Sequence, residues 1–216
     1  MNEQFTDDPC KLYLLTPPRI DADAFAEVLK SAIAAKPEIV GAVQLRLKDV
    51  DDSAFKHAAD VLMPVCHEFD VPLIINDRPD IARDCGADGV HIGQQDAAYD
   101  EARKMLGDDA IIGVTCHASR DLAIEAGDAG ADYVAFGAFF PSDSKETKHH
   151  ATTDILEFWS QMTIVPCVAI GGITADNCGP LIDAGANYLA VIGSVWNHPD
   201  GPEAGILAFA GVLPQG

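Results

Sequence analysis

The segments LIIND (residues 73–77) and ADGVHIGQQD (residues 87–96) decide the fold, because they read as strand, helix, strand with polar residues at both strand ends. Asn76 and Asp77 follow the first apolar run, and His91 and Asp96 lie in or after the second. In parallel α/β folds the carboxyl ends of the strands build the site, so Asp77 and Asp96 are expected to meet there. Two carboxylates on facing loops suit Mg²⁺, although an Asp after a strand is also a common helix cap or turn residue.

The same alternation of strand and helix continues along the chain. Strands are predicted at 11–16, 41–48, 73–77, 87–92, 110–115, 133–136, 166–170 and 188–192. Helices are predicted at 22–34 and 52–69. One more lies between the strands at 73–77 and 87–92, and the next ends at residue 106. The remaining helices are predicted at 120–129, 154–162 and 175–184, and from about residue 202. Gly-Ala-Asp or Gly-Ala-Asn recurs at 86–88, 130–132 and 185–187, where a left-handed glycine ends a helix before a strand.

Eight successive strand and helix units predict an α/β protein that closes into a (β/α)8 TIM barrel. A doubly wound open sheet is the alternative. No Pro/Gly/Ser-rich linker divides the chain, so a single domain is expected over residues 1–216, with residues 1–9 as a flexible N-terminal tail.

Composition excludes several classes of function. The 216 residues carry a net charge of -20, which argues against binding to nucleic acid or to an anionic membrane. The six cysteines form no C-x-x-C pair and are expected to be reduced thiols. No signal peptide or membrane-spanning run is apparent, so a soluble cytoplasmic protein is expected. Barrels of this kind often form homo-oligomers, but the sequence does not specify an oligomeric state.

Polar residues collect at the predicted carboxyl ends of the strands. Their alignment across several strands is stronger evidence for a site than any one of them. The set comprises Gln44, Arg46, Lys48, Asn76, Asp77, His91, Asp96, Thr115, His117 and Lys145.

Two further stretches suit a phosphorylated ligand. Gly171-Gly172 after the seventh strand and Ile192-Gly193-Ser194 after the eighth offer free backbone amides, as barrels often do for phosphate, although tight turns alone would explain them. The loop at 137–152 concentrates hydroxyls and cations and is either a lid over such a substrate or an ordinary solvated loop. No third ligand accompanies His149 and His150 for a metal.

These motifs together resemble the thiamine phosphate synthase family over nearly the whole chain. The matching pieces are LYLLT (12–16), Q-x-R-x-K (44–48), ND (76–77), GVHIGQ-x-D (89–96), GVT-x-H (113–117), DYV-x-FG (132–137) and IGGI (170–173). The resemblance implies a barrel transferase that joins hydroxymethylpyrimidine diphosphate to a thiazole phosphate or its carboxylate. Thiamine phosphate forms and pyrophosphate leaves.

The resemblance also implies roles for individual residues. Asp77 and Asp96 would bind Mg²⁺, which bridges the diphosphate. The diphosphate oxygens would be held by Arg46, Lys48, Asn76 and Lys145, with Arg46, Lys48 and Lys145 as the catalytic cations. Gln44 and Thr115 would contact the pyrimidine diphosphate. The thiazole phosphate side would be lined by Ser142, Ser144, Gly172, Ile192 and Gly193. Further substrate-binding residues would be His91, Gly171 and Ser194.

Three positions depart from the family pattern. Thr115 replaces the usual serine of the fifth strand, and Asp143 adds a negative charge to the usual hydroxyl and lysine loop. Gly193 takes the place of a serine often found after the eighth strand, with Ser194 one position later. Two other functions are weighed against the transferase: a related barrel that isomerises the thiazole carboxylate with His117 as acid or base, and a regulatory paralogue that only binds a phosphorylated ligand.

Overall fold

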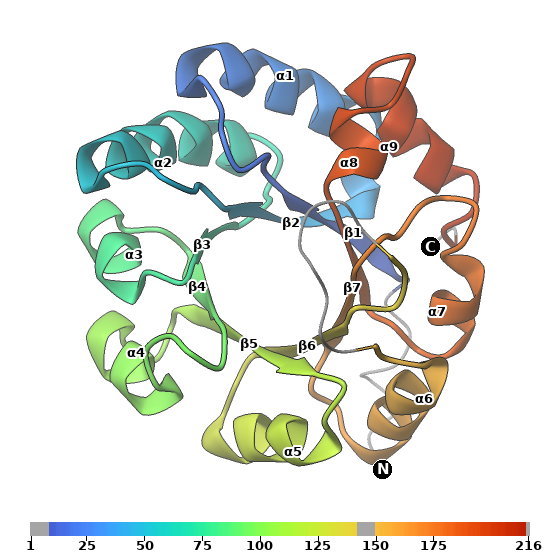
Figure 1. The fold of residues 1–216 in the computed structure, drawn as a ribbon. Helices are drawn as coiled ribbons and strands as arrows, with labels where there is room; N and C mark the ends of the chain where they lie inside the picture. The colour runs from blue at the N-terminus through green and yellow to red at the C-terminus, as the bar shows by residue number, and fades with distance from the viewer. Residues whose placement is uncertain (1–8, 142–149, 215–216) are drawn as a thin grey trace.

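The chain folds into a closed barrel of eight parallel strands in the order β1 to β8, with helices outside it (Figure 1). The computed structural model describes residues 9–141 and 150–214. The strands are β1 (Lys11–Leu15), β2 (Val40–Leu45), β3 (Leu73–Asn76), β4 (Gly89–Ile92), β5 (Ile111–His117), β6 (Tyr133–Gly137), β7 (Cys167–Ile170) and β8 (Tyr188–Val191). The TIM barrel is confirmed, and pairing of β1 with β8 excludes the open sheet.

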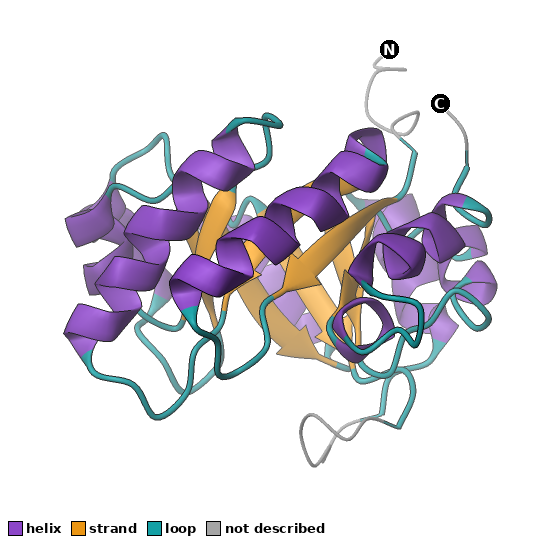
Figure 2. Cartoon of the chain, turned by 90° about the horizontal axis from the view of Figure 1, so that it is seen from above, coloured by secondary structure: helices purple, strands orange, loops and turns teal. Residues whose placement is uncertain are grey.

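The helices form a layer around the barrel, and Figure 2 shows them flanking the strands. They are α1 (Ala22–Ala35), the 3₁₀ helix η1 (Pro37–Ile39), α2 (Asp52–His67), α3 (Pro79–Cys85), α4 (Tyr99–Leu106), α5 (Arg120–Ala129), α6 (Thr153–Met162), α7 (Gly179–Asp183), α8 (Gly193–Trp196) and α9 (Pro202–Ala210). Within the described residues, no helix is long and apolar enough to cross a membrane.

Strand alternation divides the core into two parts. Outward residues of the strands pack against the helices in one large apolar cluster, for example Leu12, Val43 and Phe136. Inward residues form a smaller cluster inside the barrel that includes Tyr13, Ile74 and Tyr133. This period of two is what the extended backbone imposes, and it sends one residue in two toward the barrel axis.

Several predicted boundaries are wrong, and each has a local cause. The second strand ends at Leu45 instead of residue 48, because the Arg46 N–H donates to Thr16 Oγ1 and the Lys48 N–H donates to the carbonyl of Pro18. Helix α7 begins at Gly179 instead of residue 175, because Asn177 folds residues 174–177 into a turn by accepting from the Thr174 N–H. The short helices η1 and α8 were not predicted.

The terminal residues 1–8 of the expected tail and residues 142–149 of the expected lid lie outside the described residues. Cys10 is already buried and leads directly into β1. All six cysteines are free thiols, as expected.

Candidate active site

The two carboxylates predicted to bind metal meet at the carboxyl end of β3 and β4. Asp77 follows β3 directly in a left-handed conformation (φ 62°), and its N–H donates to the carbonyl of His91 at 2.8 Å. Asp96 closes the turn after β4, where its Oδ2 accepts from the Gly93 N–H at 2.7 Å. Removal of water by the surrounding protein, and then the facing Asp96 carboxylate, raise the pKa of Asp77 to about 6. Two carboxylates therefore face each other at the rim.

A cation stands beside this pair. Arg46 leaves the end of β2 half-buried, and burial lowers its pKa while the charge of Asp77 raises it. Asn76 lies beside this pair and donates to the Asp77 carboxylate. This hydrogen bond lowers the pKa of that carboxyl, but burial and the Asp96 carboxylate raise the pKa by more. Lys48 lies further along the loop and is exposed. The structure thus brings Arg46, Asn76, Asp77 and Asp96 together and leaves Lys48 at the periphery.

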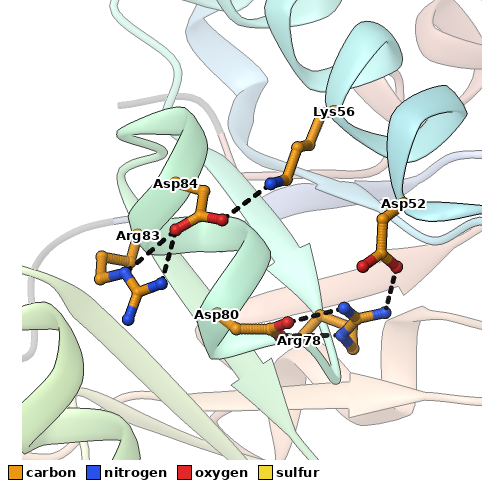
Figure 3. Close-up of polar contacts among 6 residues, drawn as sticks. All are labelled: Asp52, Lys56, Arg78, Asp80, Arg83 and Asp84. Atoms are coloured by element: carbon orange, nitrogen blue, oxygen red, sulfur yellow. Dashed lines mark hydrogen bonds and ion pairs between the residues drawn. The ribbon is translucent and has the colours of Figure 1, made fainter.

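The residue after Asp77 ties this part of the rim to the outer helices (Figure 3). Arg78 forms a two-pronged ion pair with Asp80, at 2.8 and 2.6 Å, and its third nitrogen contacts Asp52 of α2 at 2.9 Å. A second group further along α3 joins Asp84 to Lys56 and Arg83. Arg78 therefore fixes the peptide that presents Asp77.

A chain of polar side chains crosses the barrel interior below this rim. Gln44 Nε2 donates to the Tyr13 hydroxyl at 3.1 Å, and the hydroxyls of Tyr13 and Tyr133 lie 2.6 Å apart. His91 Nδ1 lies 2.9 Å from the Tyr133 hydroxyl, and His91 Nε2 lies 2.7 Å from Thr115 Oγ1. Sequence reasoning missed both tyrosines, although strand alternation already directs them inward.

His91 is placed differently from the sequence expectation. It is only 8% exposed, and both of its ring nitrogens face protein hydroxyls, so it lies inside the barrel and not at the rim. Burial lowers its pKa to about 4. A direct contact between His91 and substrate stays a prediction, because both ring nitrogens of His91 already form hydrogen bonds to Tyr133 and Thr115.

The glycines after β7 bring two rim segments together. Gly171 and Gly172 have positive φ values of 108° and 61°. The carbonyl of Gly171 accepts from the Phe140 N–H at 3.0 Å, and a Cβ on Gly172 would lie 2.2 Å from the carbonyl oxygen of Pro141. Absence of a side chain therefore lets the segment after β6 lie directly against this turn.

The residues after β8 begin the short helix α8. Ile192 is its N-cap, and its first residue is Gly193, where barrels commonly bind phosphate. Trp196 Nε1 anchors α8 by donating to the carbonyl of Leu15 at 2.7 Å. The hydroxyl of Ser194 is buried and has no partner among the described residues. The glycine turn and α8 form the second half of the rim.

Three predicted site residues, Ser142, Ser144 and Lys145, lie outside the described residues. A hollow of about 340 Å³ is lined by residues such as Phe140, Thr152 and Asn177. Neither Asp77 nor Asp96 lines this hollow.

The donor set at the rim fits Mg²⁺ better than a metal that needs a complete protein cage. Within the described part of the chain, no group of three His, Cys, Asp or Glu residues could hold a metal ion. Mg²⁺ is held by one or two carboxylates, with waters and substrate phosphates as its other ligands. The facing Asp77 and Asp96 supply that number of carboxylates, and burial together with the Asp96 charge raises the pKa of Asp77 although Arg46 lies beside it.

Comparisons with known proteins identify the family of the chain. Residues 12–195 match the family model described as thiamine monophosphate synthase. The thiamine-phosphate synthase of Rhodospirillum centenum is 55% identical over 94% of this chain and 98% of its own length. That of Erythrobacter litoralis is 48% identical, with 95% and 96% covered. A solved thiamine phosphate pyrophosphorylase from Pyrococcus furiosus superposes with a TM-score of 0.81 at 27% identity, covering 94% of both chains. The chain therefore belongs to the thiamine monophosphate synthase family, whose members are transferases of thiamine biosynthesis.

Proposed function

We propose that this chain uses Mg²⁺ to join hydroxymethylpyrimidine diphosphate to a thiazole phosphate, forming thiamine phosphate and releasing pyrophosphate. The observation that carries the proposal is the meeting of Asp77 and Asp96 beside Arg46. Burial and then the Asp96 carboxylate raise the pKa of Asp77 to about 6, while the charge of Arg46 lowers it. A carboxylate pair with one adjacent guanidinium is suited to a metal-bound diphosphate, since the metal and the arginine both bind anionic oxygens.

The chemistry needs charge stabilisation and no nucleophilic side chain. The bond between the pyrimidine methylene carbon and the bridging oxygen breaks, and its electron pair leaves with pyrophosphate. The thiazole nitrogen then uses its lone pair to form the new carbon–nitrogen bond. When bound, Mg²⁺ would neutralise charge that develops on the leaving diphosphate.

The side chains of the rim would bind the metal and the diphosphate. Asp77 and Asp96 would hold the metal, and Arg46, Lys48 and Asn76 would hold the diphosphate oxygens. Fixed cations stabilise the leaving group without moving a proton, because pyrophosphate departs as an anion. Lys145 is assigned the same role by the family resemblance alone, as Ser142 and Ser144 are assigned to the thiazole phosphate.

The second half of the rim is assigned to the thiazole phosphate. The backbone around Gly171, Gly172, Ile192 and Gly193 and the position of Ser194 support this assignment, since turns after the seventh and eighth strands often bind phosphate in barrels. The two phosphorylated substrates then enter from opposite sides. We place the activity in the cytoplasm, where the six free cysteines would stay reduced.

The test is pyrophosphate release by the purified protein with both substrates, with each alone, and with Mg²⁺ removed by EDTA. Release that needs both substrates and the metal is the expected result. Release that persists in EDTA would remove the metal role, and binding of a phosphorylated thiazole without release would favour the isomerase or the regulatory binder.

A further inference from the structure

The polar chain inside the barrel has only two self-consistent arrangements of its protons. His91 is buried against two hydroxyls, Thr115 and Tyr133, and as a neutral imidazole it has one donor nitrogen and one acceptor nitrogen. Each hydroxyl donates one proton. Tyr13 and Tyr133 are both buried, and a buried hydroxyl proton without an acceptor is costly, so each of these hydroxyls must donate to a neighbour in the chain. With that condition, the direction of one hydrogen bond determines the directions of the others.

In the first arrangement every bond runs from Gln44 toward Thr115. The Gln44 amide donates to Tyr13, Tyr13 donates to Tyr133, Tyr133 donates to His91 Nδ1, and His91 Nε2–H donates to Thr115. This leaves the carbonyl oxygen of Gln44 as a free acceptor and the Thr115 O–H as a free donor. In the second arrangement every bond is reversed, and Gln44 is left with N–H groups while Thr115 has no proton to give. The side-chain orientation of Gln44, with Nε2 toward Tyr13, corresponds to the first.

A glycine makes this chain of contacts possible. Gly113 on β5 lies between His91 on β4 and Tyr133 on β6 in the strand register. The Tyr133 ring lies over it, and a Cβ at this position would be 2.3 Å from ring carbons on both sides. The ring consequently stacks on His91 with centroids 5.6 Å apart and an interplanar angle of 20°. The absence of a side chain at Gly113 therefore lets the Tyr133 ring pack closely against His91.

We propose that Tyr13 and Tyr133 are positioning residues that set the hydrogen-bond direction across the barrel, so that Gln44 accepts from the pyrimidine substrate while Thr115 donates to it. The inference rests on the proposed function, under which Gln44 and Thr115 face the pyrimidine diphosphate. An atom of that substrate without a proton, such as a diphosphate oxygen or a ring nitrogen, needs a donor at Thr115. The same direction of bonds then requires a substrate N–H at Gln44. Two contacts on different strands are thereby coupled.

The first experiment reads the direction without any substrate. In ¹⁵N-labelled protein, long-range ¹⁵N–¹H NMR should show His91 as the neutral tautomer with its proton on Nε2, with the signal identified by its loss in His91→Gln. Tyr133→Phe removes the donor to Nδ1 and should give exchange between both tautomers. A wild-type His91 protonated on Nδ1, or on both nitrogens, would overturn the proposal.

The second experiment measures kinetics in Tyr13→Phe, Tyr133→Phe and the double variant. Loss of one hydrogen bond should raise KM for the pyrimidine diphosphate roughly three- to tenfold and leave KM for the thiazole phosphate unchanged. The double variant should be no worse than the more affected single variant, because both tyrosines act through one chain. Equal changes in both KM values, or effects that multiply, would contradict positioning.

Tyr99→Phe is the matched control, since its hydroxyl donates to the Gly130 carbonyl outside the barrel. It should change neither KM value. Should Tyr133→Phe unfold, Tyr13→Phe alone still tests the chain. If the wild type releases no pyrophosphate but shows the Nε2–H tautomer, the proposed function fails and the direction of the hydrogen bonds stands; the opposite result removes only the direction.

Discussion

On the β3–β4 side of the barrel mouth the site is made of charged side chains, whereas on the β7–β8 side it is made largely of backbone. Arg46 follows β2, Asp77 follows β3 and Asp96 lies in the turn after β4, and the charges of Arg46 and Asp77 shift each other's pKa values. Gly171 and Gly172 instead have no side chain, and their backbone lies against the segment after β6. Activity should therefore be sensitive to a substitution on the β3–β4 side that removes charge and keeps the shape of the side chain. On the β7–β8 side it should be sensitive to a substitution that adds volume and leaves the charge unchanged.

Asp77→Asn should give the largest effect, because it removes charge while nearly preserving shape. We expect kcat/KM for pyrophosphate release to fall at least about a hundredfold, since a metal ligand and its charge stabilisation contribute several kcal/mol. Asp84→Asn is the matched control: it removes the same charge from the far end of α3, where Asp84 contacts Lys56 and Arg83. Near-wild-type turnover in Asp77→Asn across a range of Mg²⁺ concentrations would contradict the metal role.

The same variant has a pH signature in the metal-free protein. The folded pKa of Asp77, about 6, is raised above the value of about 3.9 expected in the unfolded chain. The fold therefore disfavours the ionised carboxylate, and wild-type stability should fall as pH rises from about 4 to 6 relative to Asp77→Asn. Thermal melts over this range check the difference. Added Mg²⁺ should raise the wild-type Tm at pH 7 and leave the variant unchanged.

Gly172→Ala tests the backbone side and should come second in its effect on catalysis. The left-handed φ of 61° and the 2.2 Å approach to the Pro141 carbonyl oxygen leave no room for a Cβ. We expect a loss of about 2 kcal/mol in stability and a higher KM for the thiazole phosphate. Gly179→Ala is the control, because nothing lies within 4 Å of its added Cβ. A rise confined to KM for the pyrimidine diphosphate would mean that the two sides are wrongly assigned.

The comparison also shows what the sequence could predict. The alternation of strands and helices and the recurring Gly-Ala-Asp junctions are local features of the sequence. They were sufficient to predict the closed barrel. Asp77 and Asp96 were predicted to meet because Asp77 ends one strand and Asp96 lies shortly after the next, and parallel topology puts such positions at one rim. Metal and substrate roles for these residues stay predictions.

The missed features depend on contacts between strands that are distant in the sequence. Tyr13 and Tyr133 read as ordinary apolar strand residues, and only barrel closure brings their hydroxyls to 2.6 Å. His91 was expected at the rim, but the strand register pairs it with Gly113. Gly113 lies two residues before Thr115 on β5 and is therefore further from the rim. Helix α8 has four residues, too few to show any periodicity.

Arg78→Ala should have the smallest effect and tests whether the charged side of the mouth depends on support from outside the barrel. Arg78 adjoins Asp77 and ties its peptide to Asp80 and Asp52 through exposed ion pairs. Such pairs contribute about 1 kcal/mol at most, so the Mg²⁺ concentration for half-maximal activity should rise roughly two- to fivefold with kcat little changed.

Arg83→Ala removes a similar exposed ion pair from the opposite end of α3 and should leave the Mg²⁺ dependence as it is. Because Arg78 caps the start of α3 and Arg83 lies near its end, a difference between the two variants separates the effect of the position next to Asp77 from a general loss of surface charge. Equal shifts in both variants would show that long-range charge, and not the anchoring of the Asp77 peptide, determines metal affinity at this rim.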